Sequence, residues 1–228
     1  FKTKEPYLLN GKTQLKRIDN KKLQKGDQLL VISEQGLGDT LQYMRYIPCL
    51  RNEGFDVSFS AQEKLHSLIK VSAIHSDPLT TERANQVSEG EWIPLLSLPR
   101  HLNVTPKNPI ITKPYIYSTD KLNKKWKTIL SKEKRAIVGI NWQGNPAMEK
   151  NLYQGRSIPL ETFSKLLDGN EITLLSLQKG FGSEQLNHCP FKNNFIKSQP
   201  KIDVTWDFLE NAAIIENCDL IITSDTVI

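Results

Sequence analysis

The residues with the clearest capacity for chemistry are Gly36, Gly38 and Asp39, which follow an apolar run over residues 29–32. Two glycines one residue apart let a backbone turn tightly and approach a ligand or another chain segment closely. From Leu41 onward the apolar residues recur at helical spacing, so a strand, a turn and a helix are predicted in that order. Asp39 would then lie at the start of the helix, where backbone N–H groups and the helix dipole hold a carboxylate.

Spacing alone leaves two interpretations of this turn open. Asp39 is either a binding or catalytic group or an ordinary helix N-cap, and the glycines either approach a ligand or serve only the turn. The pattern is not the dinucleotide-binding fingerprint, because Leu41 stands where its third glycine belongs. It is not a Walker loop either, since no Gly-Lys-Ser/Thr ends it. The turn is therefore a candidate site without an assigned reaction.

Three further polar clusters come directly after predicted strands in the second half of the chain. They are residues 142–145 (WQGN), 178–180 (QKG) and 224–226 (SDT). Ligands of parallel α/β sheets bind at the carboxyl ends of the strands. Three clusters at one edge, together with the turn before Asp39, therefore predict a binding cleft.

The charged residues in and near these three clusters of the second half suit the binding of a diphosphate. Lys179 and Arg156 could neutralise its charge, and Asp225 and Thr226 could offer it the N–H groups of a helix N-terminus. Surface charge and a simple helix cap are the alternative interpretation of the same residues.

Strands that alternate with helices predict the fold class α/β with parallel sheets. The predicted strands cover residues 29–32, 55–60, a short stretch from Trp92, 136–142, 172–177 and 220–223. The predicted helices include 41–50, 121–130, a stretch through 163–167, and 208–215. Two polar stretches, residues 1–27 and 80–90, are predicted to be a loosely ordered N-terminal segment and a surface loop.

Three prolines between residues 104 and 118 predict an extended connector. It divides the chain into two Rossmann-like domains, 1–118 and 119–228. The second domain stops directly after a strand, so we expect it to be truncated.

Composition excludes several classes of function. The chain has 38% hydrophobic and 24% charged residues and no apolar run long enough to span a membrane, as in a soluble protein. Lysine runs at 2–25 and 121–135 either form solvated surfaces or attract phosphates, acidic glycans or an anionic membrane. Nucleic acid is a weaker option, because no recognised binding motif accompanies the charge.

Cysteines and histidines indicate a reducing compartment without a metal centre. Three widely spaced cysteines do not form a disulfide framework. The four histidines have no metal-ligand spacing, and no Asp-x-Asp occurs that could hold a divalent metal on a nucleotide sugar. We therefore expect no metal and no cofactor.

Taken together, the motifs resemble a known family. The first motif comprises residues 34–42 (EQGLGDTLQ) and 45–48 (RYIP), and the later ones, in order, are 139–145 (GINWQGN), 156–160 (RSIPL), 176–180 (SLQKG) and 224–226 (SDT). This ordered set resembles the heptosyltransferase-like glycosyltransferases of glycosyltransferase family nine. In bacteria these are often attached to tetratricopeptide repeats. The resemblance covers roughly residues 26–228.

The resemblance implies a GT-B architecture, in which two Rossmann-like domains bind acceptor and nucleotide-sugar donor without an essential metal. Asp39 matches the carboxylate proposed as general base in heptosyltransferases, and Gly36 and Gly38 form its glycine turn. The donor-binding positions implied by the family motifs are Trp142, Gln143, Arg156, Gln178, Lys179, Asp225 and Thr226.

The sequence also departs from the family. Heptosyltransferases have small hydroxyl residues and a lysine where this chain has Trp142, Gln143 and Arg156. The motif that begins at Asp225 continues in the family with a histidine beyond the last residue of the sequence. Because of these differences, the motifs do not identify the donor sugar or the nucleobase of the donor, and they leave open whether this stretch of chain is active.

The resulting prediction is an inverting, metal-independent glycosyltransferase that moves a sugar from a nucleotide-sugar donor to a glycan, lipid or protein hydroxyl. We expect it in the cytoplasm, at the inner face of the membrane, with a tetratricopeptide region in the parent protein. The alternative is a noncatalytic nucleotide-sugar-binding or scaffolding module of a repeat protein. A nicotinamide oxidoreductase is disfavoured by the missing third glycine.

Overall fold

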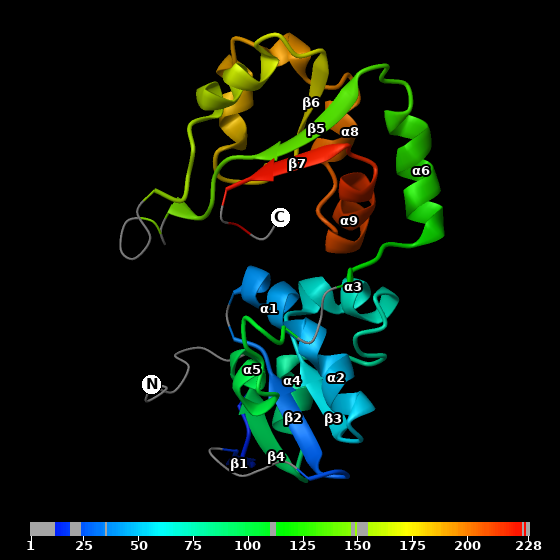
Figure 1. Cartoon of the computed structure of the whole chain (residues 1–228), viewed down its shortest axis with the longest axis vertical. Helices are drawn as coiled ribbons and strands as arrows, with labels where there is room; N and C mark the ends of the chain where they lie inside the picture. Colours follow the sequence, from blue (N-terminus) through cyan, green and yellow to red (C-terminus); the bar gives the residue numbers. More distant parts are fainter. Residues whose placement is uncertain are drawn as a thin grey trace. The chain divides into compact units, whose positions relative to one another are not determined.

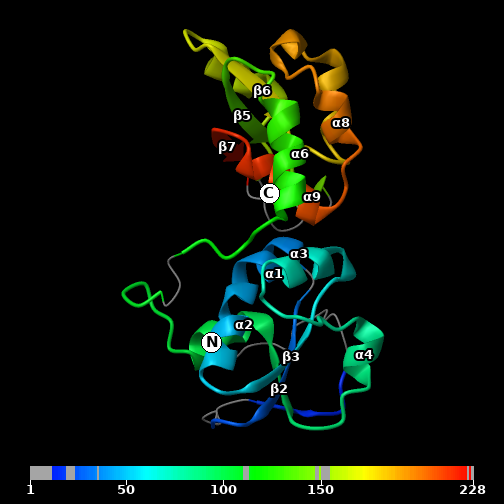
Figure 2. The same ribbon diagram turned by 90° about the vertical axis from the view of Figure 1, so that its right-hand side faces the viewer.

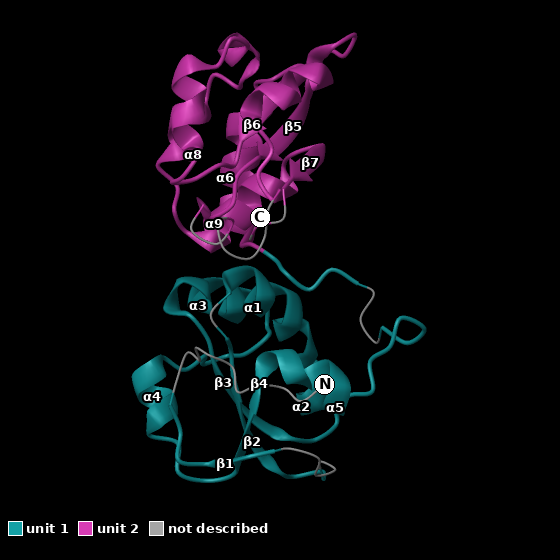
Figure 3. Cartoon of the chain, turned by 90° about the vertical axis from the view of Figure 1, so that its left-hand side faces the viewer, with its two compact units in different colours: residues 1–117 teal, residues 118–228 magenta. Residues whose placement is uncertain are grey.

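The structure is a computed structural model, and it describes residues 12–18, 24–34, 36–109, 113–146, 149, 155–224 and 226. The chain forms two compact units, residues 1–117 and 118–228, and each is built around its own sheet (Figure 3). Every strand pairing within the two sheets is parallel. The prediction of an α/β protein with parallel sheets is therefore confirmed.

The first unit contains a four-stranded sheet in the order β1-β4-β2-β3 (Figure 1). Its strands are β1 (Lys16–Arg17), β2 (Gln28–Ile32), β3 (Asp56–Ser60) and β4 (Glu91–Pro94). Its helical elements are α1 (Leu37–Tyr43), the 3-10 helix η1 (Met44–Tyr46), α2 (Ile47–Asn52), η2 (Glu63–Leu65), α3 (His66–Val71), α4 (Thr81–Asn85), η3 (Leu95–Ser97) and α5 (Leu98–His101).

Strand β2 lies inside this sheet, which explains its unbroken apolar sequence. Its last four residues are all at least 98% buried, as expected for a parallel strand covered on both faces. Leu30 and Ile32 pack against Ala84 of α4, while the alternating residues Leu29 and Val31 point to the opposite face. This burial fixes where the strand ends and where the glycine turn begins.

Three predictions for the first unit need correction. Residues 80–90 are not only a loop, because they contain α4, whose first turn is capped by the Thr80 hydroxyl accepting from the N–H of Arg83 (3.3 Å). The polar N-terminal segment contributes the edge strand β1, which pairs with β4. The helix predicted from Leu41, which Pro48 was expected to bend or shorten, is two helices, α1 and α2, joined by η1, and Pro48 lies in the first turn of α2.

The second unit contains a three-stranded sheet in the order β6-β5-β7. Its strands are β5 (Ala136–Asn141), β6 (Ile172–Ser176) and β7 (Leu220–Thr223). Its described helical elements are α6 (Asp120–Leu130), η4 (Leu160–Leu167), η5 (Ser183–His188), η6 (Lys192–Asn194), α8 (Gln199–Asp203) and α9 (Phe208–Glu216).

Two apolar layers cover this second sheet. On one face α6, α8 and α9 pack Trp126, Ile202 and Ile214 against the strands, and Figures 1 and 2 both show α6 and α9 side by side. On the other face Phe163 of η4 packs against Val138 and Ile140. The stretch through 163–167 was predicted as a helix, and in the structure it is the 3-10 helix η4. The strand ends, with their polar loops, remain at the edge between the layers.

Candidate functional site

The glycine turn begins at the carboxyl end of β2 and leads into α1. Gly36 is the residue that precedes the helix, with φ −75° and ψ 123°, and Gly38 and Asp39 lie within the first turn of α1. Asp39 is exposed and is not the helix N-cap, so that alternative interpretation is wrong. A carboxylate in the first turn still interacts favourably with the N-terminal N–H groups of a helix.

The side chain of Asp39 folds back over Gly36. A Cβ atom added to Gly36 would overlap the Oδ2 atom of Asp39. A φ of −75° suits any residue, so a side chain at this position would be excluded only by the Asp39 carboxylate, which would have to move aside. The close contact at Gly36 is therefore with a residue of the same turn, and an approach to a ligand stays a prediction.

Gln62 connects this turn to the end of β3. Its amide Nε2 donates to the carbonyl oxygen of Glu34 (2.9 Å), and its Oε1 accepts from the Thr40 hydroxyl (2.9 Å). Thr40 is completely buried next to the exposed Asp39. The side chain of Gln62, two residues beyond β3, thus contacts both ends of the glycine turn.

Glu34 is the titratable group whose pKa the structure changes most clearly at this edge. Its Oε2 accepts from the backbone N–H of Leu96 in η3 (3.3 Å). Burial raises the pKa of its carboxyl group to about 7, and the nearby charge of Asp39 acts in the same direction. The sequence motif includes Glu34, but spacing carried no signal that singled it out.

In the second unit Gln178 joins the loops that follow β5 and β6. Its Oε1 accepts from the N–H groups of Trp142 (3.1 Å) and Gln143 (2.9 Å). Its Nε2 donates to the carbonyl oxygens of Gln143 (3.0 Å) and Phe181 (2.6 Å). Gln178 is only 4% exposed, so its amide is used entirely within the protein.

Trp142 and Gln143 are also engaged in internal contacts. The Trp142 ring is fully buried, and its Nε1 donates to the carbonyl oxygen of Gly182 (3.2 Å). The Oε1 of Gln143 accepts from Nε2 of Gln185 (2.9 Å). The structure therefore brings Trp142, Gln143 and Gln178 together, as predicted from the strand ends, in a cluster that shapes two loops.

Lys179 points to α8. Its ammonium group donates to the carbonyl oxygen of Ile202 in the last turn of that helix, where a positive charge is favourable. Burial lowers the pKa of Lys179, and the charge of Asp203 opposes this shift. Arg156 is partly buried. Two residues further on, the Ile158 N–H donates to the carbonyl oxygen of Trp142 (2.8 Å), the residue directly after β5.

The end of β7 lies next to the end of β5. The Ser224 N–H donates to the carbonyl oxygen of Asn141 (2.9 Å), and the Thr226 hydroxyl donates to the Asn141 side-chain oxygen (3.1 Å). Asn141, which is 4% exposed, was not predicted as a site residue. Asp225 lies outside the described residues.

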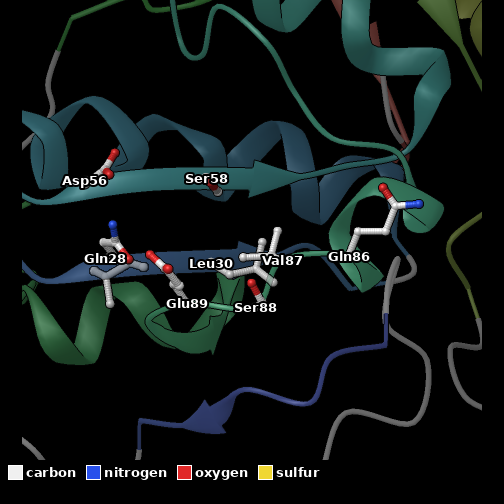
Figure 4. A pocket seen from close by; sticks show the side chains of 9 residues that line it. Gln28, Leu30, Asp56, Ser58, Gln86, Val87, Ser88 and Glu89 are labelled. Carbon is white, nitrogen blue, oxygen red and sulfur yellow. The ribbon is translucent and has the colours of Figure 1, made fainter.

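A pocket of about 280 Å³ opens on the first unit, away from the glycine turn (Figure 4). Gln28 and Asp56, at the beginnings of β2 and β3, line it together with the loop of residues 86–89. Because ligands of parallel sheets bind at the carboxyl ends of strands, this position does not suit the predicted site.

A groove of about 350 Å³ lies on the second unit. Its lining residues include Lys125, Ile129, Lys201, Val204, Trp206 and Asp207. Trp206 is 67% exposed and Val204 is 76% exposed, which is unusual for large apolar side chains. The sequence analysis did not predict this groove. The one sequence signal for it is Trp206, a tryptophan between two polar residues.

In the described part of the chain, no three His, Cys, Asp or Glu residues are grouped so that they could hold a metal ion. None of the helices described is long and apolar enough to cross a membrane.

Comparisons with known proteins give one likeness in structure. No protein-family model matches the chain, and no curated protein sequence matches it significantly. The chain is similar to the solved structure of E. coli ADP-heptose LPS heptosyltransferase II, with 12% sequence identity and a TM-score of 0.47. The match covers 88% of this chain and 80% of the other.

Proposed function

We propose that the chain is an inverting, metal-independent glycosyltransferase of the GT-B type. It would move a sugar from a nucleotide-sugar donor to a hydroxyl group of a glycan, lipid or protein. The observation that supports this most is the position of Asp39, an exposed carboxylate in the first turn of α1 at the carboxyl end of β2. This is where parallel α/β sheets place their reacting groups.

In the proposed reaction Asp39 is the general base. It takes the proton of the acceptor hydroxyl while that oxygen forms a bond to the anomeric carbon of the donor sugar. The bond from that carbon to the diphosphate oxygen breaks, and the nucleoside diphosphate leaves with the electron pair. Attack from the side opposite the leaving group inverts the anomeric configuration. A general base of this kind typically contributes about 10²–10⁴-fold to the rate.

We place the donor at the strand ends of the second unit. In this proposal Gln178 and Trp142 act mainly by holding the loops in shape, since their polar groups are already hydrogen-bonded. Gln143, Arg156, Lys179, Asp225 and Thr226 are the proposed contacts to the nucleotide and diphosphate. Lys179 would have to exchange its bond to the Ile202 carbonyl for a phosphate oxygen.

The setting of the reaction is also a proposal. We place the protein in the bacterial cytoplasm, at the inner face of the membrane, where a lipid-linked acceptor would be available. Its lysine-rich surfaces would then lie close to anionic lipid headgroups. A tetratricopeptide region in the parent protein would supply the contact to a protein partner.

One observation favours the second candidate, a noncatalytic scaffolding module. The exposed Trp206 and Val204 line a groove, and exposed aromatic side chains are enriched where proteins bind one another. In that case replacement of Trp206 by Ala would abolish partner binding, while Asp39→Asn would change nothing measurable.

Calorimetric titration with ADP-, UDP- and GDP-sugars tests the proposal at the donor side. The transferase predicts tight binding of one nucleotide series, and Asp39→Asn should retain that binding because the residue lies in the other unit. If a well-folded protein bound none of the three series, the scaffolding function would be favoured instead.

A further inference from the structure

Gln185 of η5 connects the beginning of η4 to the side chain of Gln143 in the loop after β5. Its Oε1 accepts from the backbone N–H of Leu160 (3.1 Å), and its Nε2 donates to the Oε1 of Gln143 (2.9 Å). A backbone N–H group can only donate, so the contact with Leu160 fixes which end of the Gln185 amide is the oxygen. The Nε2 of Gln185 is therefore the end that meets Gln143.

The same reasoning fixes the amide of Gln143. Because the Nε2 of Gln185 can only donate, the atom of Gln143 that it meets must be the oxygen. Gly182 packs against the same side chain, since a Cβ atom added to this glycine would lie only 2.5 Å from Oε1 of Gln143 and 3.0 Å from its Cβ. Gly182 also has a φ of +85°, which other residues rarely adopt. Gln143 is therefore held in one orientation by a hydrogen bond and by a close backbone contact.

This orientation leaves the NH2 group of Gln143 available to a ligand. Every hydrogen bond that Gln143 makes among the described residues uses its backbone or its Oε1, and the residue is partly exposed. Gln143 lies two residues beyond β5, at the carboxyl end of the strand, where ligands of parallel sheets bind. The ammonium group of Lys179, which follows β6 at the same edge, can also only donate. A ligand that meets these groups must supply acceptor oxygens, and negative charge on it strengthens the bonds.

We propose that Gln185 is a positioning residue of the donor site, which holds Gln143 so that its NH2 group donates to a diphosphate oxygen of the nucleotide sugar. An unrestrained glutamine amide can turn over and offer a ligand either its oxygen or its NH2 group. Held by Gln185, Gln143 offers donors alone, which selects the oxygens of a diphosphate. This inference rests on the proposed function, because it takes the strand ends of the second unit as the donor site.

Gln185→Glu tests the direction of these contacts with almost no change in side-chain size. The new carboxylate still accepts from the Leu160 N–H but cannot donate, so the Gln143 amide should turn over and offer its oxygen to the ligand. In calorimetric titrations with ADP, UDP and GDP, the nucleotide that binds best should lose at least about tenfold in affinity. Asn187→Asp, at an exposed residue of the same 3-10 helix, adds the same charge and should lose no more than about twofold.

A double-mutant cycle separates positioning from a merely structural role. In a chain that carries Gln143→Leu, the further change Gln185→Glu should lower the affinity for the diphosphate no more than Asn187→Asp does, because no amide is left to turn over. Equal losses from Gln185→Glu with and without the Gln143 amide would overturn the proposal.

Hydrogen exchange of the side-chain amides, measured by nitrogen-15 NMR, tests the orientation without any ligand. In the unaltered protein the bonded Nε2 hydrogen of Gln185 should exchange more slowly than both Nε2 hydrogens of Gln143. In Gln185→Glu the Gln143 amide should become slow to exchange. Equally slow exchange of both amides in the unaltered protein would overturn the positioning role, even if the variant did not fold.

The two measurements distinguish the failure of this inference from that of the proposed function. If the unaltered protein bound no nucleoside diphosphate, the proposed function would fail, and the ligand assigned to Gln143 would fail with it. If a diphosphate bound but Gln185→Glu behaved like Asn187→Asp, the proposed function would stand and the role of Gln185 would be wrong.

Discussion

At the carboxyl end of β2 the proposed catalytic side chain, Asp39, is exposed. At the carboxyl end of β5, Trp142, which the sequence motifs implied as a donor-binding residue, is completely buried. In the first unit neighbouring residues such as Gln62 and Thr40 make the internal hydrogen bonds, which leaves Asp39 at the surface. In the second unit Gln178 makes those bonds itself. Polar side chains that follow a strand can therefore either face a substrate or hold loops in shape. Substitutions should distinguish these two roles.

The largest effect on stability is expected for Gln178→Leu. Leucine is close in size but cannot accept from the Trp142 and Gln143 N–H groups or donate to the loop carbonyls. Leaving buried polar groups unpaired should lower the free energy of unfolding by about 3 kcal/mol. Denaturant unfolding of the variant, beside the exposed control Glu184→Gln, measures this difference. A loss below 1 kcal/mol would mean that Gln178 is available for a ligand after all.

The next effect is a change in the pH dependence of stability with Glu34→Gln. The folded pKa of about 7 lies above the ordinary value of 4.5, so the folded state holds a proton that the unfolded chain releases. The stabilisation is fully present below pH 4.5 and is lost as the pH rises through 7. Glutamine does not titrate, so the variant should gain about 2 kcal/mol over the original protein between pH 4.5 and 8, after allowance for solvent screening. Parallel stability curves for the two proteins would contradict this assignment.

A smaller effect on stability is expected for Gly36→Ala. The backbone conformation suits alanine, so the free energy of unfolding should change by no more than about 1 kcal/mol. The new Cβ atom would nevertheless displace the carboxylate of Asp39. Turnover should therefore fall at least about tenfold, because a general base must stay within hydrogen-bond reach of its proton. Unchanged turnover would show that the position of the carboxylate does not matter.

The sequence predicted the parts of the fold whose signal is local. The apolar runs that form β2, β5 and β6 marked buried parallel strands, because each is covered on both faces. The apolar run of β7 was predicted as a strand too, although that strand is only partly buried. Strand β1 was missed because Lys16 and Arg17 are polar and join the sheet through backbone pairing. Helix α4 was missed because Ala84 is its only buried residue, which is too little for an apolar periodicity.

The places of the candidate residues in the fold were predictable, but their contacts were not. Strand ends and glycines located Asp39 and the loops around Trp142 and Gln178. Contacts between distant residues, such as Gln62 with Glu34, have no local signal. Spacing likewise could not tell that the Gln178 amide turns inward while Asp39 faces outward, because the direction of a side chain depends on what packs around it.

The central claim is that Asp39 acts as a catalytic base and contributes little to the stability of the fold. It is tested most directly by measuring sugar transfer, donor binding and unfolding on Asp39→Asn, with Asp56→Asn as the matched exposed control in the same unit. We expect the Asp39 variant to lose at least about 100-fold in kcat. Its donor affinity should stay unchanged, as should its free energy of unfolding, to within about 0.5 kcal/mol. Sugar transfer at the original rate by Asp39→Asn would contradict the account.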